Sequence, residues 1–360
     1  MKSTKNRFFL LFAALFLALT LACWFHSPRA ESLTERRKLA QKPELTLKSF
    51  TGGSFASSFE SYSQDQFPLR EGFRTLKALF QTKVLGRQDN NNIYVRDGWL
   101  AQLEYPENLS SADHAASRFQ QVYDRYLSGS SRVYLSVIPD KGYFLEGIPK
   151  MDHGAFVSRL REKTPFAAYI DLFPTLTLDS YYRTDTHWRQ EAILPAAQAL
   201  AGAMGKEIGS GFTAADTGIS FKGVYAGQSA LPVSGESMYY VTSPTLSAAT
   251  VWDGEQGKAI GVYDFDRLTG RDPYEFYLSG SLSLVTLKNE NAAGKDRLIL
   301  FRDSFGSSIA PYFLDCYQEV TLVDIRYIPV NRLGRLLDFE NADVLFLYST
   351  LVLNHSETLK

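Results

Sequence analysis

The chain has 360 residues, of which 45% are hydrophobic and 21% are charged, a composition that excludes a largely disordered protein. Its formal net charge of -1 at pH 7 excludes the global basic field that attracts nucleic acid. The length suits one large α/β domain, alone or with insertions.

The N-terminal 26 residues carry the strongest local signal. Three basic residues, Lys2, Lys5 and Arg7, precede an apolar run over residues 8–25 that only Thr20 interrupts. As a helix, such a run is about 27 Å long, which is close to the thickness of a bilayer core. The basic flank is expected to stay in the cytoplasm, which sends everything after the run outside.

Three interpretations of this run compete. A cleaved signal peptide needs small residues at its cleavage site, which residues 26–30 supply poorly. A lipoprotein site at Cys23 lacks the usual leucine, because Thr20 occupies that position. We therefore expect an uncleaved signal anchor over residues 1–26, with one transmembrane helix. Since Cys23 lies in this run, it cannot pair with Cys316, and no disulfide is expected within the outer domain.

The next elements are predicted from apolar spacing. The polar residues 27–54 are expected to form a linker, part of which could be an exposed helix. A helix is predicted over 59–84, with Pro68 near its start. A buried strand at 133–138 should lead into a loop at 140–142, and the segments 155–163 and 191–204 read as helices.

The C-terminal half alternates short apolar runs with helix-like segments. Strands are predicted at 284–287, 297–301, 320–325 and 344–348, with helices at 307–317 and 331–339. This alternation predicts an α/β fold with a parallel sheet flanked by helices. Residues 209–280, which are rich in Gly, Ser, Thr and Tyr, are expected to form an insertion of loops and short antiparallel strands. The main domain should cover 55–350, and 351–360 should be a C-terminal tail.

A serine follows one of these predicted strands directly. Ser304 stands between the strand that ends near Phe301 and a predicted helix, whose N-terminal N–H groups could bind a developing oxyanion. A nucleophile is one interpretation of this serine. The other is a helix N-cap, since Asp303, Ser304 and Ser307 are all good capping residues.

A histidine and an aspartate form the second candidate cluster. His187 is one of five histidines, and a serine nucleophile needs such a base near neutral pKa. Asp185, two residues earlier, could fix the imidazole tautomer. The alternative is a buried histidine bonded to a backbone carbonyl, with Asp185 as a turn residue. The chain order Asp, His, Ser is compatible with a catalytic triad.

The segments 184–188 (Thr-Asp-Thr-His-Trp) and 302–305 (Arg-Asp-Ser-Phe) together resemble the DHHW proteins of bacterial cell surfaces. These are related to the alginate O-acetyltransferases AlgJ and AlgX. Further segments fit the same pattern: 65–70, 96–100, 137–141 and 323–327. The resemblance covers residues 55–350. Thr186 stands where the family signature has its first histidine.

This resemblance implies an SGNH-hydrolase-like fold, with Ser304 as nucleophile, His187 as base and Asp185 as its orienting carboxylate. It also implies transfer of an acetyl group to a cell-surface or secreted polysaccharide. A multi-spanning membrane-bound O-acyltransferase would be the acyl donor. The expected location is the bacterial cell membrane, with a single membrane pass and an extracytoplasmic catalytic domain. Two alternatives stay open: a carbohydrate esterase of the same fold, and a non-catalytic protein for polysaccharide binding or envelope assembly.

Four further residues are weaker candidates for substrate binding. Lys141 and Arg302 could contact an anionic substrate, although solvated surface charges are the usual case. Gly280 could give a second oxyanion donor or form a turn, and Trp188 could stack on a sugar or pack against the loop of His187. No cluster has metal-ligand spacing and no Gly-rich phosphate loop is present, so no metal or cofactor is expected.

Overall fold

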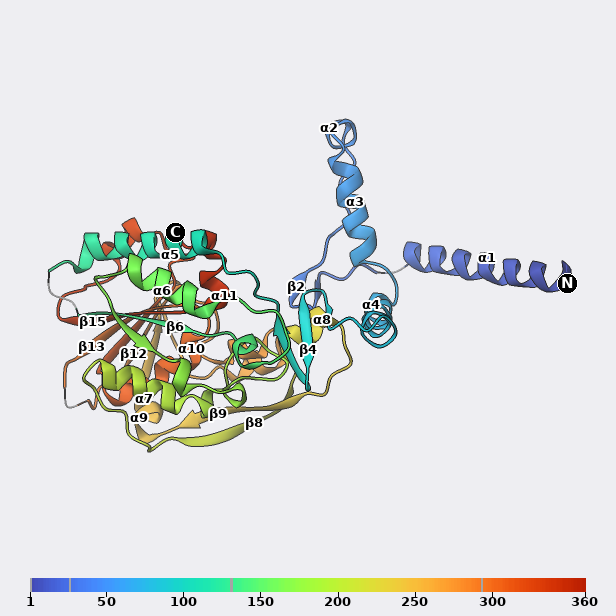
Figure 1. Ribbon diagram of the computed structural model, residues 1–360. Helices are drawn as coiled ribbons and strands as arrows, with labels where there is room; N and C mark the ends of the chain where they lie inside the picture. Colours follow the sequence, from blue (N-terminus) through green and yellow to red (C-terminus); the bar gives the residue numbers. More distant parts are fainter. Residues whose placement is uncertain (1, 26, 130–131, 293) are drawn as a thin grey trace. The chain divides into compact units, whose positions relative to one another are not determined.

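The computed structural model describes residues 2–25, 27–129, 132–292 and 294–360 (Figure 1). The chain forms two compact units. Unit 1 comprises Met1–Asn91 and Ala226–Pro232, and unit 2 comprises Asn92–Tyr225 and Val233–Lys360. The predicted start of the main domain at residue 55 therefore falls within unit 1.

Unit 1 consists mainly of helices. They are α1 (Lys2–Phe25), α2 (Leu47–Thr51), α3 (Ser54–Asp65) and α4 (Arg70–Leu79), which continues as a π-helical turn over Phe80–Val84. The short strands are β1 (Glu31–Ser32), β2 (Arg37–Lys38) and β3 (Asp89–Asn90), and α8 (Val224–Ser229) carries the chain back into this unit. In the part of the chain that the structure describes, no helix is both long and apolar enough to cross a membrane. Met1 and His26, at the ends of the predicted anchor, lie outside the described residues.

Two expectations for this region are corrected. The helix predicted over 59–84 is divided into α3 and α4, because Pro68 has no N–H to donate and Leu69 has a left-handed φ of 59°. The predicted linker also folds. β1 and β2 pair as a hairpin, and Arg37 of β2 donates to both carboxylate oxygens of Asp65, at 2.8 and 2.6 Å. The hydrogen bonds from Arg37 lower the pKa of Asp65 to about 2.

Unit 2 is built on an eight-stranded sheet in the order β11-β10-β12-β14-β13-β15-β6-β7. The strands are β6 (Arg132–Ile138), β7 (Ala168–Asp171), β10 (Thr250–Asp253), β11 (Lys258–Ile260), β12 (Leu284–Lys288), β13 (Arg297–Arg302), β14 (Glu319–Val323) and β15 (Ala342–Ser349). From β14 to β7 all neighbours are parallel, and from β11 to β14 all are antiparallel.

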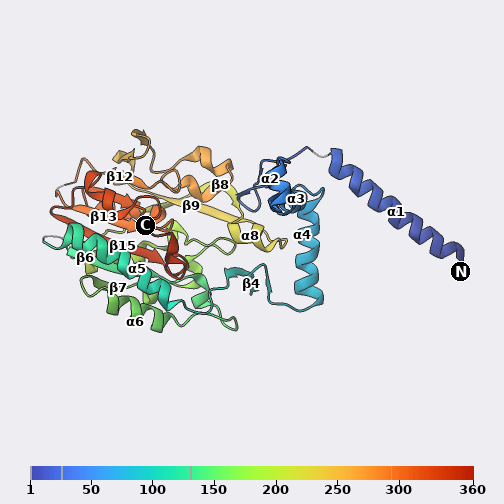
Figure 2. The same ribbon diagram turned by 90° about the horizontal axis from the view of Figure 1, so that it is seen from above.

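Helices cover both faces of this sheet, and Figure 2 shows the same arrangement from above. α5 (Leu109–Val122) and α6 (His153–Lys163) pack on one face, and α7 (Leu194–Ala203) and α10 (Gly306–Ile309) pack on the other. β15 is buried on both sides, since Leu345 and Leu347 enter one core while Val344 and Phe346 enter the other. A continuous apolar run is what such a two-sided environment requires.

The predicted α/β class with helices on both faces is therefore confirmed, and several details differ. The strand predicted at 284–287 is β12, which runs antiparallel to β14. The region 209–280 does contain an antiparallel pair, β8 (Thr213–Phe221) and β9 (Glu236–Thr242), together with α9 (Pro244–Ala248). However, β10 and β11 extend the central sheet.

Three predicted helices are shorter than expected. The helix predicted at 191–204 starts at Leu194, with Pro195 in its first turn. The helix predicted at 307–317 is α10 followed by a 3-10 turn, Ala310–Asp315, that includes Pro311, and the one at 331–339 is a 3-10 turn over Val330–Arg335.

The C-terminal end of the chain and the first segment of unit 2 are both folded. The C-terminal residues 351–360 include most of α11 (Thr350–Leu353), and the Ser356 N–H donates to Ser111 Oγ at 2.7 Å. β4 (Ile93–Arg96) and β5 (Trp99–Gln102) form a hairpin at the start of unit 2. The predicted tail is thus part of the fold.

The candidate site lies at the carboxyl ends of the parallel strands. β13 ends at Arg302 and β15 ends at Ser349, so the residues that follow β13 emerge beside the end of β15. The buried Asp303 joins the two ends, because its Oδ2 accepts hydrogen bonds from the Ser349 N–H and Oγ, both at 2.7 Å. This connection fixes the backbone immediately before Ser304.

Candidate active site

A tight hairpin carries Asp185 and His187. The Tyr182 N–H donates to the His187 carbonyl at 3.1 Å, and the Arg189 N–H donates to the Ser180 carbonyl at 2.7 Å. At the turn, Asp185 Oδ1 accepts both the His187 backbone N–H at 3.1 Å and the His187 ring Nδ1–H at 2.6 Å. The two-residue spacing therefore lets one carboxylate oxygen cap the turn and orient the ring.

The second oxygen of this carboxylate is held from another part of the chain. Asp185 Oδ2 accepts the Val224 N–H at 2.8 Å, and Asp185 is fully buried. The preceding Gly223 is needed for this approach, because a Cβ there would overlap the Asp185 backbone. Burial of a charge requires such hydrogen bonds.

Ser304 reaches the other side of the same imidazole. Its Oγ lies 2.7 Å from His187 Nε2. Since the Asp185 carboxylate accepts from Nδ1, the neutral ring has its lone pair on Nε2, and Ser304 donates its hydroxyl proton to it. Ser304 is the one residue of 301–310 that is not buried. The structure thus brings the three predicted triad residues together, with the serine open to solvent.

Aromatic residues fix the imidazole plane. The Tyr274 ring stacks on His187 with ring centroids 3.7 Å apart and an interplanar angle of 7°, and Phe305 lies against it at 5.0 Å. The Tyr274 hydroxyl is 2.8 Å from Ser308 Oγ, which also accepts the Trp188 Nε1–H at 2.7 Å. This packing restricts the rotation of His187.

The structure distinguishes between the two interpretations of Trp188. It is fully buried, and its Nε1–H donates to the Phe305 carbonyl at 3.1 Å as well as to Ser308. A ring without exposed surface cannot stack on a sugar. The alternative interpretation, packing that supports the histidine loop, fits the structure.

Lys141 is also buried instead of facing a substrate. Its Nζ donates to the carbonyls of Tyr182, Arg183 and Asp185, at 2.7, 3.0 and 2.6 Å. These three acceptors match the three N–H bonds of an ammonium group. Burial lowers the pKa of Lys141 to about 7, and the charge of Asp185 opposes this shift. Lys141 therefore supports the backbone of the histidine hairpin.

Arg302 and Gly280 likewise do not fit their expected roles. Arg302 is fully buried, donates to the carbonyls of Asp303 and Leu282 at 3.3 and 3.0 Å, and lies 3.9 Å from Asp324. Burial lowers its pKa. The Gly280 N–H, proposed as an oxyanion donor, donates to the Tyr277 carbonyl at 3.1 Å in a turn with a φ of 94°.

The amides near Ser304 define where an oxyanion could bind. The N–H groups of Phe305, Gly306 and Ser307 already donate to Asp303 Oδ1, the Asp303 carbonyl and the Ser304 carbonyl, at 3.0, 3.1 and 3.2 Å. The expectation that amides after Ser304 bind the oxyanion is therefore corrected. The N–H of Ser304 itself has no hydrogen-bond partner within the described residues. It is the available donor next to the nucleophile.

Several residues of the site come from the 209–280 region and have no local sequence signal. Glu236 accepts from the backbone N–H of Arg183 and of Thr184, both at 3.0 Å, and Tyr274 and Val224 make the contacts described above. The Gly-rich and Tyr-rich composition of that region predicts loops and short strands, but it does not indicate which of its residues contact the site. Among the described residues, no group of His, Cys, Asp or Glu gathers in a way that could hold a metal ion.

Neither a protein-family model nor a curated protein sequence matches this chain. Among solved structures, its fold is similar to that of a DHHW family protein from Eubacterium siraeum. The TM-score is 0.60 at 20% identity, covering 75% of this chain and 95% of that chain. The fold is also similar to PatB1 of Bacillus cereus, with a TM-score of 0.59 at 19% identity over 74% of this chain and 98% of that one.

A second structure of PatB1, with a sulfonyl adduct, gives a TM-score of 0.58 at 19% identity, covering 72% of this chain and 95% of that chain. The O-acetyltransferase domain of Pseudomonas putida AlgJ matches with a TM-score of 0.43 at 13% identity, over 73% and 92% of the two chains. The protein thus has a mixed α/β fold with a mostly parallel central sheet, and this fold is similar to those of the DHHW protein and PatB1.

Gly223→Ala tests the close approach that holds Asp185. Because the added methyl group would overlap the Asp185 backbone, we expect a loss of about 1–3 kcal/mol in the free energy of unfolding. Gly202→Ala is the matched control, since a Cβ there meets no atom within 4 Å, and it should change stability by less than about 1 kcal/mol. Denaturant unfolding of the full-length protein in detergent measures both. Equal effects of the two changes would contradict the assignment.

Lys141→Met tests the buried ammonium through pH. Because the pKa falls from 10.5 to about 7 on folding, the unfolded chain binds more protons between these values. The free energy of unfolding should therefore rise with pH from 7 to 10, by at most about 1.4 kcal/mol per pH unit, and Lys141→Met should lose this rise. Lys258→Met, which removes an exposed lysine, should keep it. An unchanged slope in Lys141→Met would show that Lys141 does not titrate in this way.

Proposed function

We propose that this protein is an extracytoplasmic O-acyltransferase with Ser304 as its nucleophile, which transfers an acetyl group to a cell-surface or secreted polysaccharide. The observation that carries the proposal is the hydrogen-bonded series Asp185–His187–Ser304, with separations of 2.6 and 2.7 Å. A nucleophile, a base in contact with it and a carboxylate that orients the base are the groups that acyl transfer needs. This contact favours an enzyme over a non-catalytic binding protein.

In the first half of the reaction, Ser304 Oγ attacks the carbonyl carbon of an acyl donor while His187 Nε2 takes its proton. The negative charge that develops on the carbonyl oxygen is stabilised by the Ser304 N–H, and the imidazolium is stabilised by the buried Asp185 carboxylate. The tetrahedral intermediate collapses as the bond to the leaving group breaks. His187 gives its proton to that group, which leaves an ester on Ser304.

In the second half, a hydroxyl of the acceptor replaces the leaving group. His187 Nε2 removes its proton as the oxygen attacks the ester carbonyl. When this second tetrahedral intermediate collapses, the bond between the carbonyl carbon and Ser304 Oγ breaks, and His187 returns the proton to Ser304 Oγ. The same steps with water release the free acid, which would make the protein an esterase. The chemistry of Ser304 is identical in both cases, so the acceptor that reaches the ester decides between transfer and hydrolysis.

The proposed location and partner rest on the N-terminal sequence. The basic residues Lys2, Lys5 and Arg7 before the apolar residues 8–25 favour export of the chain. An enzyme outside the cytoplasm cannot readily use cytoplasmic acetyl-CoA as its acyl donor. We therefore include in the proposal a multi-spanning membrane-bound O-acyltransferase that passes the acyl group outward to Ser304.

An activated acetyl ester such as p-nitrophenyl acetate tests the nucleophile without the membrane partner. The full-length protein in detergent should release p-nitrophenol and carry an acetyl group on Ser304. Ser304→Ala should do neither, and His187→Gln should react about 10²–10⁴-fold more slowly, because it lacks the base. Ser281→Ala, which removes an exposed serine hydroxyl, should react like the wild type.

The acceptor is tested in the same assay by adding oligosaccharides from bacterial surface polysaccharides. An acetylated sugar in the mass spectrum, absent with Ser304→Ala, supports transfer. Release of acetate alone, with and without sugar, supports the esterase. Equal reaction of the wild type and Ser304→Ala would overturn the proposed nucleophile.

A further inference from the structure

Helix α4 and the turn that follows it expose their apolar side chains. Leu69, Phe73, Leu76, Phe80 and Val84 recur every three or four residues and are between 46% and 76% exposed. Residues at this spacing lie on one face of a helix, and together with Leu69 at the N-cap of α4 they form an apolar strip, here called the α4 strip. An exposed apolar strip of this length is uncommon on a soluble protein.

The opposite face of α4 is charged and points inward. Arg70 donates to Glu35 at 2.6 Å, and Arg74 donates to the Gly227 carbonyl at 2.7 Å, while Ala78 is fully buried. The helix therefore reverses the usual arrangement, in which the apolar face packs on the protein and the charged face meets water. The hydrogen bonds of Arg70 and Arg74 hold the helix in this orientation. The α4 strip therefore faces outward.

Basic side chains flank the α4 strip. Residues 72–88 contain four basic residues, Arg74, Lys77, Lys83 and Arg87, and no acidic one. Lys77 of α4 and Lys83 of the π-helical turn lie between residues of the strip along the chain, and both are exposed. An apolar face bordered by lysines is typical of helices that lie in the interface of an anionic membrane.

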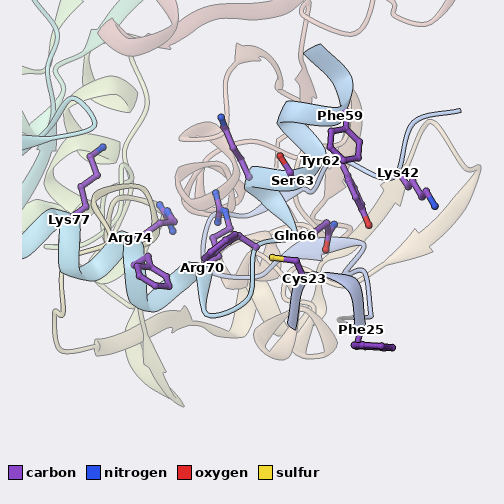
Figure 3. A pocket seen from close by; sticks show the side chains of 13 residues that line it. Cys23, Phe25, Lys42, Phe59, Tyr62, Ser63, Gln66, Arg70, Arg74 and Lys77 are labelled. Atoms are coloured by element: carbon purple, nitrogen blue, oxygen red, sulfur yellow. The ribbon is translucent and has the colours of Figure 1, made fainter. Parts of the chain in front are cut away.

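A cavity next to α4 has the same mixed character. It has a volume of about 1000 Å³ and is lined by aromatic side chains, Phe59, Tyr62 and Phe73, and by Lys42 and Lys77 (Figure 3). Aromatic walls suit a lipid acyl chain, and the ammonium groups suit an anionic headgroup. The exposed apolar side chains of α1, among them Phe8 to Phe12, add a second apolar surface in the same unit.

We propose that the α4 strip binds the surface of a bilayer containing anionic phospholipids, with Lys77 and Lys83 at the headgroups. Burial of five large apolar side chains supplies the attraction, and the two lysines supply the preference for anionic lipid. This surface is independent of the Ser304 site, and the inference does not rest on the proposed acyl transfer. It goes beyond attachment by the N-terminal segment, because it uses a different helix.

A lipid-attached quencher tests the contact in the full-length protein. In a Cys23→Ala, Cys316→Ser background, a fluorophore is placed at Leu76→Cys, within the strip, or at Asn331→Cys, an exposed polar position of unit 2. The protein is reconstituted into vesicles of phosphatidylcholine with or without phosphatidylglycerol. We expect quenching at residue 76 with anionic vesicles, and several-fold less at residue 331.

Charge variants separate the parts of the proposal. The double change Lys77→Glu and Lys83→Glu should reduce quenching at residue 76, because each lysine contributes about fivefold to partitioning onto anionic lipid. The matched control, Lys258→Glu with Arg332→Glu, alters two exposed basic residues elsewhere and should leave quenching unchanged. Equal quenching at residues 76 and 331 would overturn the proposal. Equal quenching at residue 76 with and without phosphatidylglycerol would also overturn it. The same holds if the label at residue 76 is not quenched by lipid because a protein partner covers it.

Discussion

The buried carboxylate of Asp185 is the group on which the candidate site depends. A fully buried charge is costly unless its oxygens accept hydrogen bonds, and here the acceptors are satisfied by the backbone and ring N–H groups of His187 and by the Val224 N–H. The ring is thereby held in one tautomer, with Nε2 directed at Ser304. The reactivity expected of Ser304 follows from that single constraint.

Support for this carboxylate comes from distant parts of the chain. The Lys141 ammonium, beyond the end of β6, binds three carbonyls of the hairpin, and Glu236 of β9 binds two of its N–H groups. The Tyr274 ring, stacked on the His187 imidazole, restricts the rotation of that ring. The region 209–280 is thus more than an insertion at the edge of the fold, since it completes the surroundings of Asp185 and His187.

The parts of this arrangement that are local in sequence could be predicted. The strands near 133–138, 297–301 and 344–348 are apolar on both faces, and the Asp-x-His spacing is set by a turn of three residues. Long-range contacts could not be predicted, because nothing near Tyr274 or Val224 indicates that His187 and Asp185 lie beside them. Lys141 and Arg302 were expected at the surface for a general reason: charged residues are seldom fully buried unless they are paired. The folded hairpin within 27–54 was missed because its ion pairs join residues about 30 positions apart.

Covalent trapping by a sulfonyl fluoride tests the central claim most directly, because such reagents react with a serine only where its hydroxyl is activated. The full-length protein is incubated with phenylmethylsulfonyl fluoride, and intact mass and peptide mapping locate the adduct. One sulfonyl group on Ser304 is expected, with labelling at least about 10²-fold slower in Asp185→Asn, which no longer orients the imidazole. Labelling at another residue, or equal rates in the two proteins, would contradict the dependence of Ser304 on the Asp185 carboxylate.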